Sequence, residues 1–271
     1  MTATKTHAKS LFRALAALGL TASLVGLQAP AGSAAAPPQA GVEYAQLAHP
    51  VSASPREVVE VFWFNCAHSY LLAQPLRDWA ARQNPPVTIV HIPAAWADQP
   101  AEMAYARLYY TLVKLGLEDS LEQDVFRAVR DQHQDLTQPS VLQDWAAAEG
   151  IDPQQLTDAW NSPEVQQETA DAPALREHYE VHEMPSIVVG GEYRTSPFMV
   201  PDGVAGTIPV VDYLLQHSTA EAAAKAKAAA AAKAKAAAQA KAEAKKHPKP
   251  KPKPKPKTHP SPGAPKARHH T

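Results

Sequence analysis

The segment from Val58 to Tyr70 reads Val58-Val59-Glu60-Val61-Phe62-Trp63-Phe64-Asn65-Cys66-Ala67-His68-Ser69-Tyr70. Its first seven residues are nearly all apolar and β-favouring, a pattern typical of a strand buried on both faces in the middle of a sheet. After Cys66 the apolar side chains follow helical spacing, with Leu71, Leu72, Leu76 and Trp79 on one broad face. The sequence therefore predicts a strand that passes directly into a helix at Cys66.

Further strand patterns flank this segment on both sides. Val42–Leu47 and Val87–Ile92 are short β-favouring runs. Near the end of the domain, Ser186–Val189 and Glu192–Thr195 enclose the pair Gly190-Gly191, which favours a tight hairpin turn. These runs predict a small sheet built from segments far apart in the sequence.

Between Ala101 and about Glu180 no strand pattern appears, while helix boundaries are frequent. Gly116 and Gly150 follow apolar periodic runs and suit the residue just after a helix end. Asp152-Pro153 and Ser162-Pro163 each combine a capping side chain with a proline at the first helical position. The interval is therefore predicted to be entirely helical.

Two prolines are expected to disturb helices, because proline lacks the backbone donor that an inner helical turn needs. Pro75 is predicted to kink or break the helix that follows Cys66, and Pro209 to break the start of the last helix, Val204–Leu215. The whole pattern predicts an α/β fold over residues 37–219, in which an all-helical insert of about residues 97–180 separates a β-α-β unit from a β-β-α unit. Two domains in series fit poorly, since the outer pieces are too small to bury separate cores.

The first 36 residues have the layout of a secretory signal peptide. A start with three basic and no acidic residues precedes an apolar stretch from Ala14 to Leu27 and a small-residue run that ends at Ala36. The apolar stretch is short for a membrane span, and no second one follows. We therefore expect a periplasmic mature protein with no transmembrane segment, although an uncleaved N-terminal anchor is the competing interpretation.

The formal net charge of −1 averages segments of opposite charge. Residues 37–219 hold 9 basic against 25 acidic side chains, a net charge of −16, whereas residues 220–271 hold 14 basic against 2 acidic, a net charge of +12. Within this tail, residues 220–246 contain 17 Ala and 7 Lys and favour a solvated, partial helix, and Pro248 to Lys257 alternates Pro and Lys, which favours a polyproline II rod.

The cationic tail admits two interpretations, contact with an anionic envelope surface or a solvated spacer. Nucleic acid is not expected as a partner, because the tail lacks aromatic side chains for base stacking. The histidines of the tail and of the body follow no structural metal-binding spacing, so neither a metal nor another cofactor is predicted.

Cys66 is the only cysteine in the chain, which excludes a scaffold stapled by internal disulfides. At a helix N-terminus its sulfur would face unpaired backbone N–H groups and the positive end of the helix dipole, which favour the reactive thiolate. His68 would add a hydrogen bond or a charge. The alternative is a small buried apolar side chain without chemistry.

Three segments together resemble DsbA-type thiol:disulfide interchange proteins over roughly residues 42–217. They are Glu60–Tyr70 around Cys66, Ala106–Gly116 in the helical insert, and Tyr179–Tyr193 with Met184-Pro185. The resemblance implies a thioredoxin fold with an inserted helical domain that acts in the periplasm on cysteine-containing secreted proteins.

The family motif is Cys-Pro-His-Cys, of which Cys66 and His68 match the first cysteine and the histidine. The resemblance implies that Pro185 follows a cis peptide bond, that its loop faces the active-site sulfur, and that Trp63, Tyr70, Met184 and Ser186 border the substrate. Ser69 stands where the family has its second cysteine, and Ala67 replaces the proline. Because disulfide donation needs two thiols, Cys66 alone can form only a mixed disulfide, with Ser69 expected to donate a hydrogen bond to the thiolate.

The leading hypothesis is therefore a monothiol thiol–disulfide oxidoreductase, an isomerase or thiol exchanger and not a dithiol oxidase, with Cys66, His68, Ser69 and Pro185 as catalytic residues. Its partners would be cysteine-containing secreted proteins or a small thiol. The alternatives are a non-catalytic peptide-binding or chaperone-like module tethered at the envelope by its tail, and a covalent homodimer through Cys66.

Overall fold

The computed structural model describes residues 36–246. Apart from Ala36, the predicted signal peptide lies outside the described residues, as does the predicted polyproline rod at 248–257.

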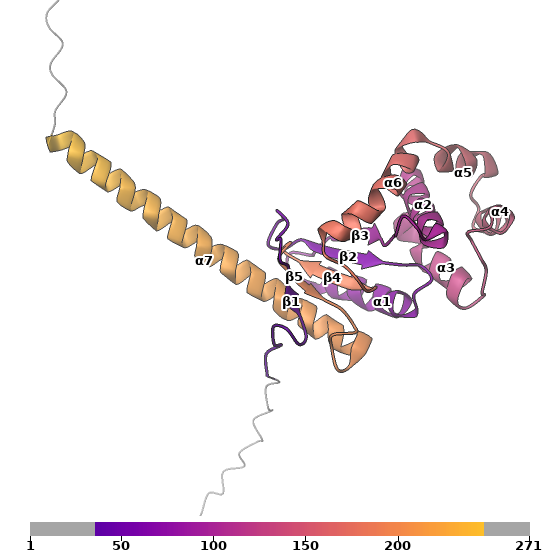
Figure 1. Cartoon of the computed structure of the whole chain (residues 1–271), viewed down its shortest axis with the longest axis horizontal. Helices are drawn as coiled ribbons and strands as arrows, with labels where there is room; N and C mark the ends of the chain where they lie inside the picture. The colour runs from indigo at the N-terminus through magenta and orange to yellow at the C-terminus, as the bar shows by residue number, and fades with distance from the viewer. Residues whose placement is uncertain (1–35, 247–271) are drawn as a thin grey trace, which may run out of the picture. The chain divides into compact units, whose positions relative to one another are not determined.

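A five-stranded mixed sheet forms the centre of the domain (Figure 1). Its strands are β1 (Ala45–Gln46), β2 (Val58–Phe62), β3 (Ile89–Pro93), β4 (Ser186–Val189) and β5 (Tyr193–Thr195). They lie in the order β1-β5-β4-β2-β3, with only the β2–β3 pair parallel. The structure confirms the predicted α/β fold, in which strands distant in the sequence belong to one sheet.

Strand β2 is central and buried along its whole length, as its apolar sequence predicts. Helix α1 (Ala67–Arg82) follows it and provides the crossover to the parallel strand β3. The first strand is shorter than expected from Val42–Leu47, because the backbone turns at Gly41, whose N–H donates to the Tyr44 carbonyl at 2.7 Å. The Gly190-Gly191 hairpin between β4 and β5 is confirmed, and both glycines have positive φ.

The break predicted at Pro209 is wrong, because helix α7 (Gly203–Lys246) continues through this residue. Helix α1 likewise continues through Pro75 without a break. Proline removes only one backbone hydrogen bond, and buried side chains hold the helix on both sides of it. In α1 these are Leu72 before Pro75 and Trp79 after it, which pack in one core cluster with the sheet.

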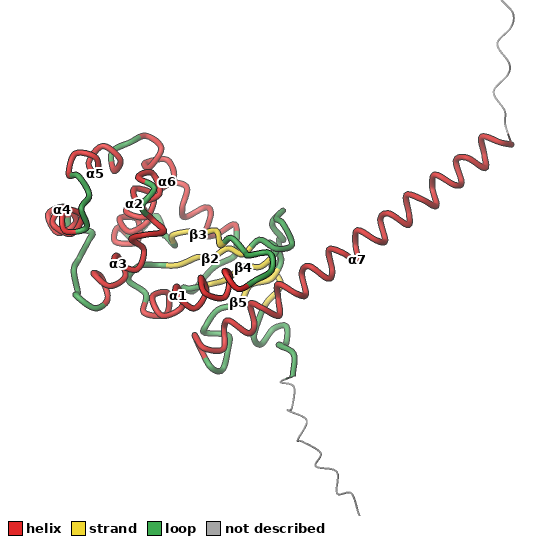
Figure 2. The backbone as a smooth tube through the Cα atoms, turned by 180° about the vertical axis from the view of Figure 1, so that it is seen from behind, coloured by secondary structure: helices red, strands yellow, loops and turns green. Residues whose placement is uncertain are grey.

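Five helices connect β3 to β4 and form the predicted insert (Figure 2). They are α2 (Pro100–Leu115), α3 (Glu118–Arg130), α4 (Pro139–Ala148), α5 (Pro153–Trp160) and α6 (Pro163–His178). Their ends follow the sequence closely: Gly116 caps α2 in the left-handed conformation, and the side chains of Asp152 and Ser162 accept the first backbone N–H groups of α5 and α6.

The insert shares its core with the sheet. Phe62 and Phe64, from β2 and the loop after it, pack edge-on against each other with ring centroids 5.0 Å apart, and both contact Phe126 of α3. Aromatic contacts of this kind, added to the area that each ring buries, stabilise the junction. The loop that carries Cys66 is thus held between the sheet and the insert.

Helix α7 runs without interruption from the body into the alanine- and lysine-rich tail. Its first turns bury Val211 and Leu214 against α1 and the sheet, whereas residues 223–243 are exposed. The last contacts with the body are made by Glu221, which accepts from the Tyr193 hydroxyl at 2.6 Å, and Lys225, which pairs with Glu192 at 3.6 Å. Among residues 36–246, no helix combines the length and the apolar character needed to cross a membrane.

Candidate functional site

Cys66 lies at the junction of strand and helix that the sequence predicts. It is the N-cap residue of α1, with extended backbone angles, and it is partly exposed. Its side chain makes no capping hydrogen bond, so the first backbone N–H groups of α1 are not used by the sulfur in this conformation. A thiolate at this position would find these donors and the positive end of the helix dipole beside it.

The loop before β4 faces the sulfur. The Met184-Pro185 peptide bond is cis, Pro185 is buried, and Met184 is partly exposed. The Cys66 thiol donates a hydrogen bond to the Met184 carbonyl oxygen at an Sγ–O distance of 3.2 Å. Residues 118 positions apart in the sequence therefore meet at the sulfur.

His68 lies in the first turn of α1, where its ring contacts Phe198 with the centroids 4.7 Å apart. No hydrogen bond joins His68 to Cys66 within residues 36–246. Phe198 was not predicted, and its side chain is 59% exposed. Together with the exposed Leu71 of α1, it adds apolar surface to the helix that carries the cysteine.

Ser69, which occupies the position of the family's second cysteine, is fully buried. Its hydroxyl oxygen accepts a hydrogen bond from the Trp63 backbone N–H at 3.3 Å, and the expected bond to the Cys66 sulfur is not among those of the described residues. Ser69 therefore fastens the loop before Cys66 to the first turn of α1. The indole N–H of Trp63 is buried without a hydrogen-bond partner.

Two residues expected to border the substrate are engaged within the protein. The ring of Tyr70 stacks on Phe126 at 5.5 Å, and its hydroxyl donates to Asp131 at 2.8 Å. The hydroxyl of Ser186 donates to the Glu183 carbonyl at 2.8 Å, and the residue is buried. Their side chains hold the insert and the Met184-Pro185 loop in place.

Sequence reasoning also missed Arg130, at the end of α3. Its guanidinium donates to both the carbonyl oxygen and the side-chain oxygen of Asn65, at 2.9 and 2.8 Å. This pair ties the residue before Cys66 to the helical insert. The contact depends on the relative placement of two elements, and no local sequence pattern indicates it.

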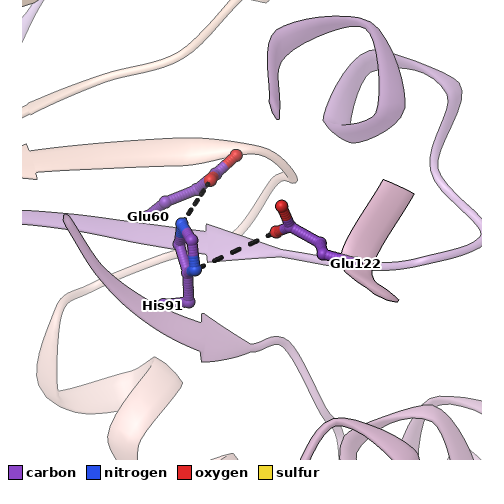
Figure 3. A group of neighbouring side chains, drawn as sticks. All are labelled: Glu60, His91 and Glu122. Atoms are coloured by element: carbon purple, nitrogen blue, oxygen red, sulfur yellow. Dashed lines mark ion pairs between the residues drawn. The ribbon is translucent and has the colours of Figure 1, made fainter. Parts of the chain in front are cut away.

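A buried polar cluster lies elsewhere between the sheet and the insert (Figure 3). Glu60 Oε2 of β2 is 3.4 Å from His91 Nε2 of β3, and Glu122 Oε1 of α3 is 3.9 Å from His91 Nδ1. Arg77 of α1 forms an ion pair with the other oxygen of Glu122. The spacing of these residues in the sequence did not indicate a cluster, because each comes from a different element.

Burial sets the protonation of this cluster. It raises the pKa of Glu60 to about 8, against the opposing effect of the Arg77 cation, and burial followed by the same cation lowers the pKa of His91 to about 4. At neutral pH, therefore, Glu60 holds a proton and His91 is neutral, while Arg77 forms an ion pair with Glu122.

Glu60, His91 and Glu122 also bring metal-ligating atoms within 4.8 Å of one another. The two carboxylates, however, face opposite nitrogens of the imidazole ring (Figure 3), whereas a single ion needs its ligand atoms around one point. Arg77, which forms an ion pair with Glu122, already places a cation beside the cluster. The arrangement therefore does not favour a divalent cation.

Comparison with known proteins agrees with this architecture. Residues 98–206 match the family model of the DSBA-like thioredoxin domain. The thiol:disulfide interchange proteins DsbA of Burkholderia cepacia and Pseudomonas aeruginosa are each 30% identical, over 77% of this chain and 96% and 97% of theirs.

Solved structures give the same result. The crystal structure of Pseudomonas aeruginosa DsbA superposes with a TM-score of 0.62 at 30% identity, covering 68% of this chain and 96% of that one. DsbA from Xylella fastidiosa superposes with a TM-score of 0.60 at 26% identity, covering 68% and 98%. Similarity of this extent, over nearly the full length of the relatives, shows that the chain belongs to the DsbA family of thiol:disulfide interchange proteins.

Proposed function

We propose that this protein is a periplasmic thiol–disulfide oxidoreductase that works with one thiol, Cys66. The observation that carries the proposal is the partly exposed cysteine at the N-terminus of α1, 3.2 Å from the carbonyl oxygen of Met184. Ser69 in the place of a second cysteine limits the chemistry to exchange, since the chain has no other thiol.

The exchange step conserves electrons. The Cys66 thiolate attacks one sulfur of a partner disulfide, a new S–S bond forms to Cys66, and the other partner sulfur leaves as a thiolate with the electron pair of the broken bond. A second thiol, from the client protein or from a small thiol, then attacks the mixed disulfide and releases Cys66. The net result is rearrangement or transfer of a disulfide, with no gain or loss of one.

Several contacts support this role for the loop around Cys66. Arg130 holds Asn65, Ser69 holds Trp63, and the Met184-Pro185 loop contacts the sulfur. The loop thus keeps the sulfur at the start of α1, in a residue that is partly exposed. Accessibility and a position at a helix N-terminus are the properties that distinguish reactive from structural cysteines.

The decisive experiment measures the reaction of the mature protein with oxidised glutathione. Mass spectrometry measures how fast the glutathione adduct forms on Cys66 at pH 6 to 7. We expect this rate to be at least about tenfold higher in the folded protein than in urea, where the same thiol lies in an unfolded chain. Reduced glutathione should remove the adduct. An equal or slower rate in the folded protein would reject the exchange proposal.

Isomerase activity is then tested on a client with scrambled disulfides. The wild-type protein should restore native disulfides faster than Cys66→Ser, provided that a small thiol is present to release the mixed disulfide. A Cys66→Ser variant with equal activity would instead support the binding-module alternative, which the names of the curated relatives do not favour.

Periplasmic location forms part of the proposal because the first 36 residues have signal-peptide layout. Fractionation of expressing cells would test it, with the mature chain expected to begin near Ala35 to Pro37.

The exposed lysines of α7 would further attract an anionic envelope surface. Co-sedimentation with anionic but not with neutral vesicles, lost on removal of the tail, is the expected result.

A further inference from the structure

An open cavity lies beside the loop that carries Cys66. Its volume is about 330 Å³, and Asn65, the residue before the cysteine, forms part of its wall. Four further lining residues, His133, Gln134, Asp135 and Thr137, come from the segment after α3. A partner whose sulfur reacts at Cys66 therefore has this cavity next to it.

Two neighbouring lining residues, Gln134 and Asp135, bring acceptor oxygens to the cavity, whereas the oxygens of Asn65 are already bound by Arg130. Gln134 Oε1 is buried and has no hydrogen-bond partner. The Asp135 carboxylate accepts from the hydroxyl and backbone of Thr137 and from the side-chain amide of Gln138, and these hydrogen bonds lower the pKa of Asp135, so it is charged at neutral pH. An unpaired buried acceptor and a carboxylate fit a ligand that brings donors and positive charge.

The backbone at the cavity is also unusual. His133 has a φ of 54°, in the left-handed region that favours glycine, where α3 ends. A histidine at this position is less stable than a glycine, and its side chain lines the cavity. Such a residue is expected where its side chain serves binding and not the fold.

We infer that this cavity binds a cationic side chain, lysine or arginine, of a residue that flanks the reacting cysteine in the partner. The inference rests on the proposed exchange at Cys66 and names the class of partner that the site prefers. Gln134 and Asp135 would accept the hydrogen bonds of the ammonium or guanidinium group, and the net charge of −16 of the body would favour the approach of a cationic client.

The test uses short peptides with one cysteine, activated as a mixed disulfide with 5-thio-2-nitrobenzoate. Attack by Cys66 forms the peptide–Cys66 disulfide and releases the coloured thiolate, so the absorbance gives a second-order rate. Lysine is placed in turn at each of the two positions before the cysteine and the two positions after it. The rate of each lysine peptide is compared with that of the same peptide carrying norleucine, which has similar length and no charge.

We expect the best lysine peptide to react about fivefold faster than its norleucine counterpart, a ratio that corresponds to about 1 kcal/mol. The ratio should fall towards one in Gln134→Leu and in Asp135→Asn, and it should decrease with added salt. Asp158→Asn, which removes a carboxylate from α5 outside the cavity, serves as the matched control and should keep both rates.

A ratio near one at every position in the wild-type protein would overturn the inference, as would a ratio that neither cavity variant lowers. Asp135 also accepts a hydrogen bond from Thr137, so Asp135→Asn could lower the rate ratio by disturbing the loop. Gln134→Leu leaves that hydrogen bond intact, so a lower ratio in this variant has to come from the cavity itself. Failure of the exchange proposal gives a different result. In that case every peptide would release the chromophore no faster with the folded protein than with the urea-unfolded protein.

Discussion

His91 Nε2 lies 3.4 Å from Glu60 Oε2, and this contact joins the parallel strands β3 and β2 inside the protein. His91 also faces the insert through its second nitrogen, which lies near Glu122, and Glu122 in turn pairs with Arg77 of α1. The stability of the junction between sheet and insert therefore depends on which of these groups hold protons.

The first prediction concerns stability above neutral pH. The pKa of Glu60 is about 8 in the folded protein and about 4.5 when unfolded, so between these values the folded state binds one more proton. The free energy of unfolding should therefore fall as pH rises, by up to about 1.4 kcal/mol per pH unit between pH 6.5 and 8. Urea unfolding followed by tryptophan fluorescence at several pH values measures this slope.

Below pH 6.5, His91 acts in the opposite direction. Its pKa is about 4 when folded and 6.5 when unfolded, so its contribution to the free energy of unfolding rises with pH over that range and offsets the effect of Glu60. Glu60→Gln should remove the decrease in the free energy of unfolding above pH 6.5. The control Glu149→Gln, at an exposed position, should leave that decrease unchanged. An unchanged alkaline slope in Glu60→Gln would mean that Glu60 is ionised at neutral pH.

Much of the fold was predictable because local patterns were strong. The uninterrupted apolar run before Cys66 predicted the buried central strand, and Asp152-Pro153 and Ser162-Pro163 predicted the helix starts. The predicted break failed at Pro209, where packing of Val211 and Leu214 outweighs the preference of a single residue.

The site was less predictable because its parts come from different elements. Local sequence placed Cys66 at a helix start, and the resemblance supplied the Met184-Pro185 loop. The Arg130–Asn65 pair, the contact of Phe198 with His68, and the Glu60 cluster arise only when distant segments pack together. Residue types alone do not indicate such contacts.

The second prediction concerns the backbone at His133. Replacement by glycine should stabilise the protein by about 0.5–1 kcal/mol, because glycine adopts a φ of 54° without steric penalty, although it gains some freedom in the unfolded chain. The urea midpoint measures this change. The same variant should lower the preference for lysine peptides, so a gain in stability would accompany a loss in recognition.

Gln132→Gly is the matched control for this variant, since Gln132 does not have positive φ and glycine there should destabilise. If His133→Gly also destabilised the protein, the histidine would contribute contacts to the fold that outweigh its backbone conformation.

The third prediction locates the end of the folded body within α7. Truncation after Lys227 should leave the urea midpoint unchanged, because the described side chains beyond Lys225 make no hydrogen bond or ion pair with the body. Truncation after Thr219 should destabilise by about 1–3 kcal/mol, since it removes the carboxylate that pairs with the buried Tyr193 hydroxyl. Equal midpoints for the two truncations would show that Glu221 contributes nothing.

The last prediction restores the missing thiol. Ser69 lies in the first turn of α1, three residues after Cys66, so Ser69→Cys places two thiols at one helix start. We expect oxidised glutathione to convert this variant to an internal disulfide with no free thiol, whereas the wild-type protein should stop at the glutathione adduct. The variant should then oxidise a reduced dithiol peptide, which gains the disulfide as the two protein thiols are reformed.

Ser140→Cys is the control for this gain, because it adds a second thiol in α4 of the insert, away from the start of α1. It should accept glutathione at both positions and transfer no internal disulfide. If Ser69→Cys behaved in the same way, the first turn of α1 would not bring the two sulfurs together, and the serine would be required for the geometry of the loop through its bond to the Trp63 N–H. If the internal disulfide forms and is transferred, the single substitution at position 69 accounts for the restriction of this chain to exchange chemistry.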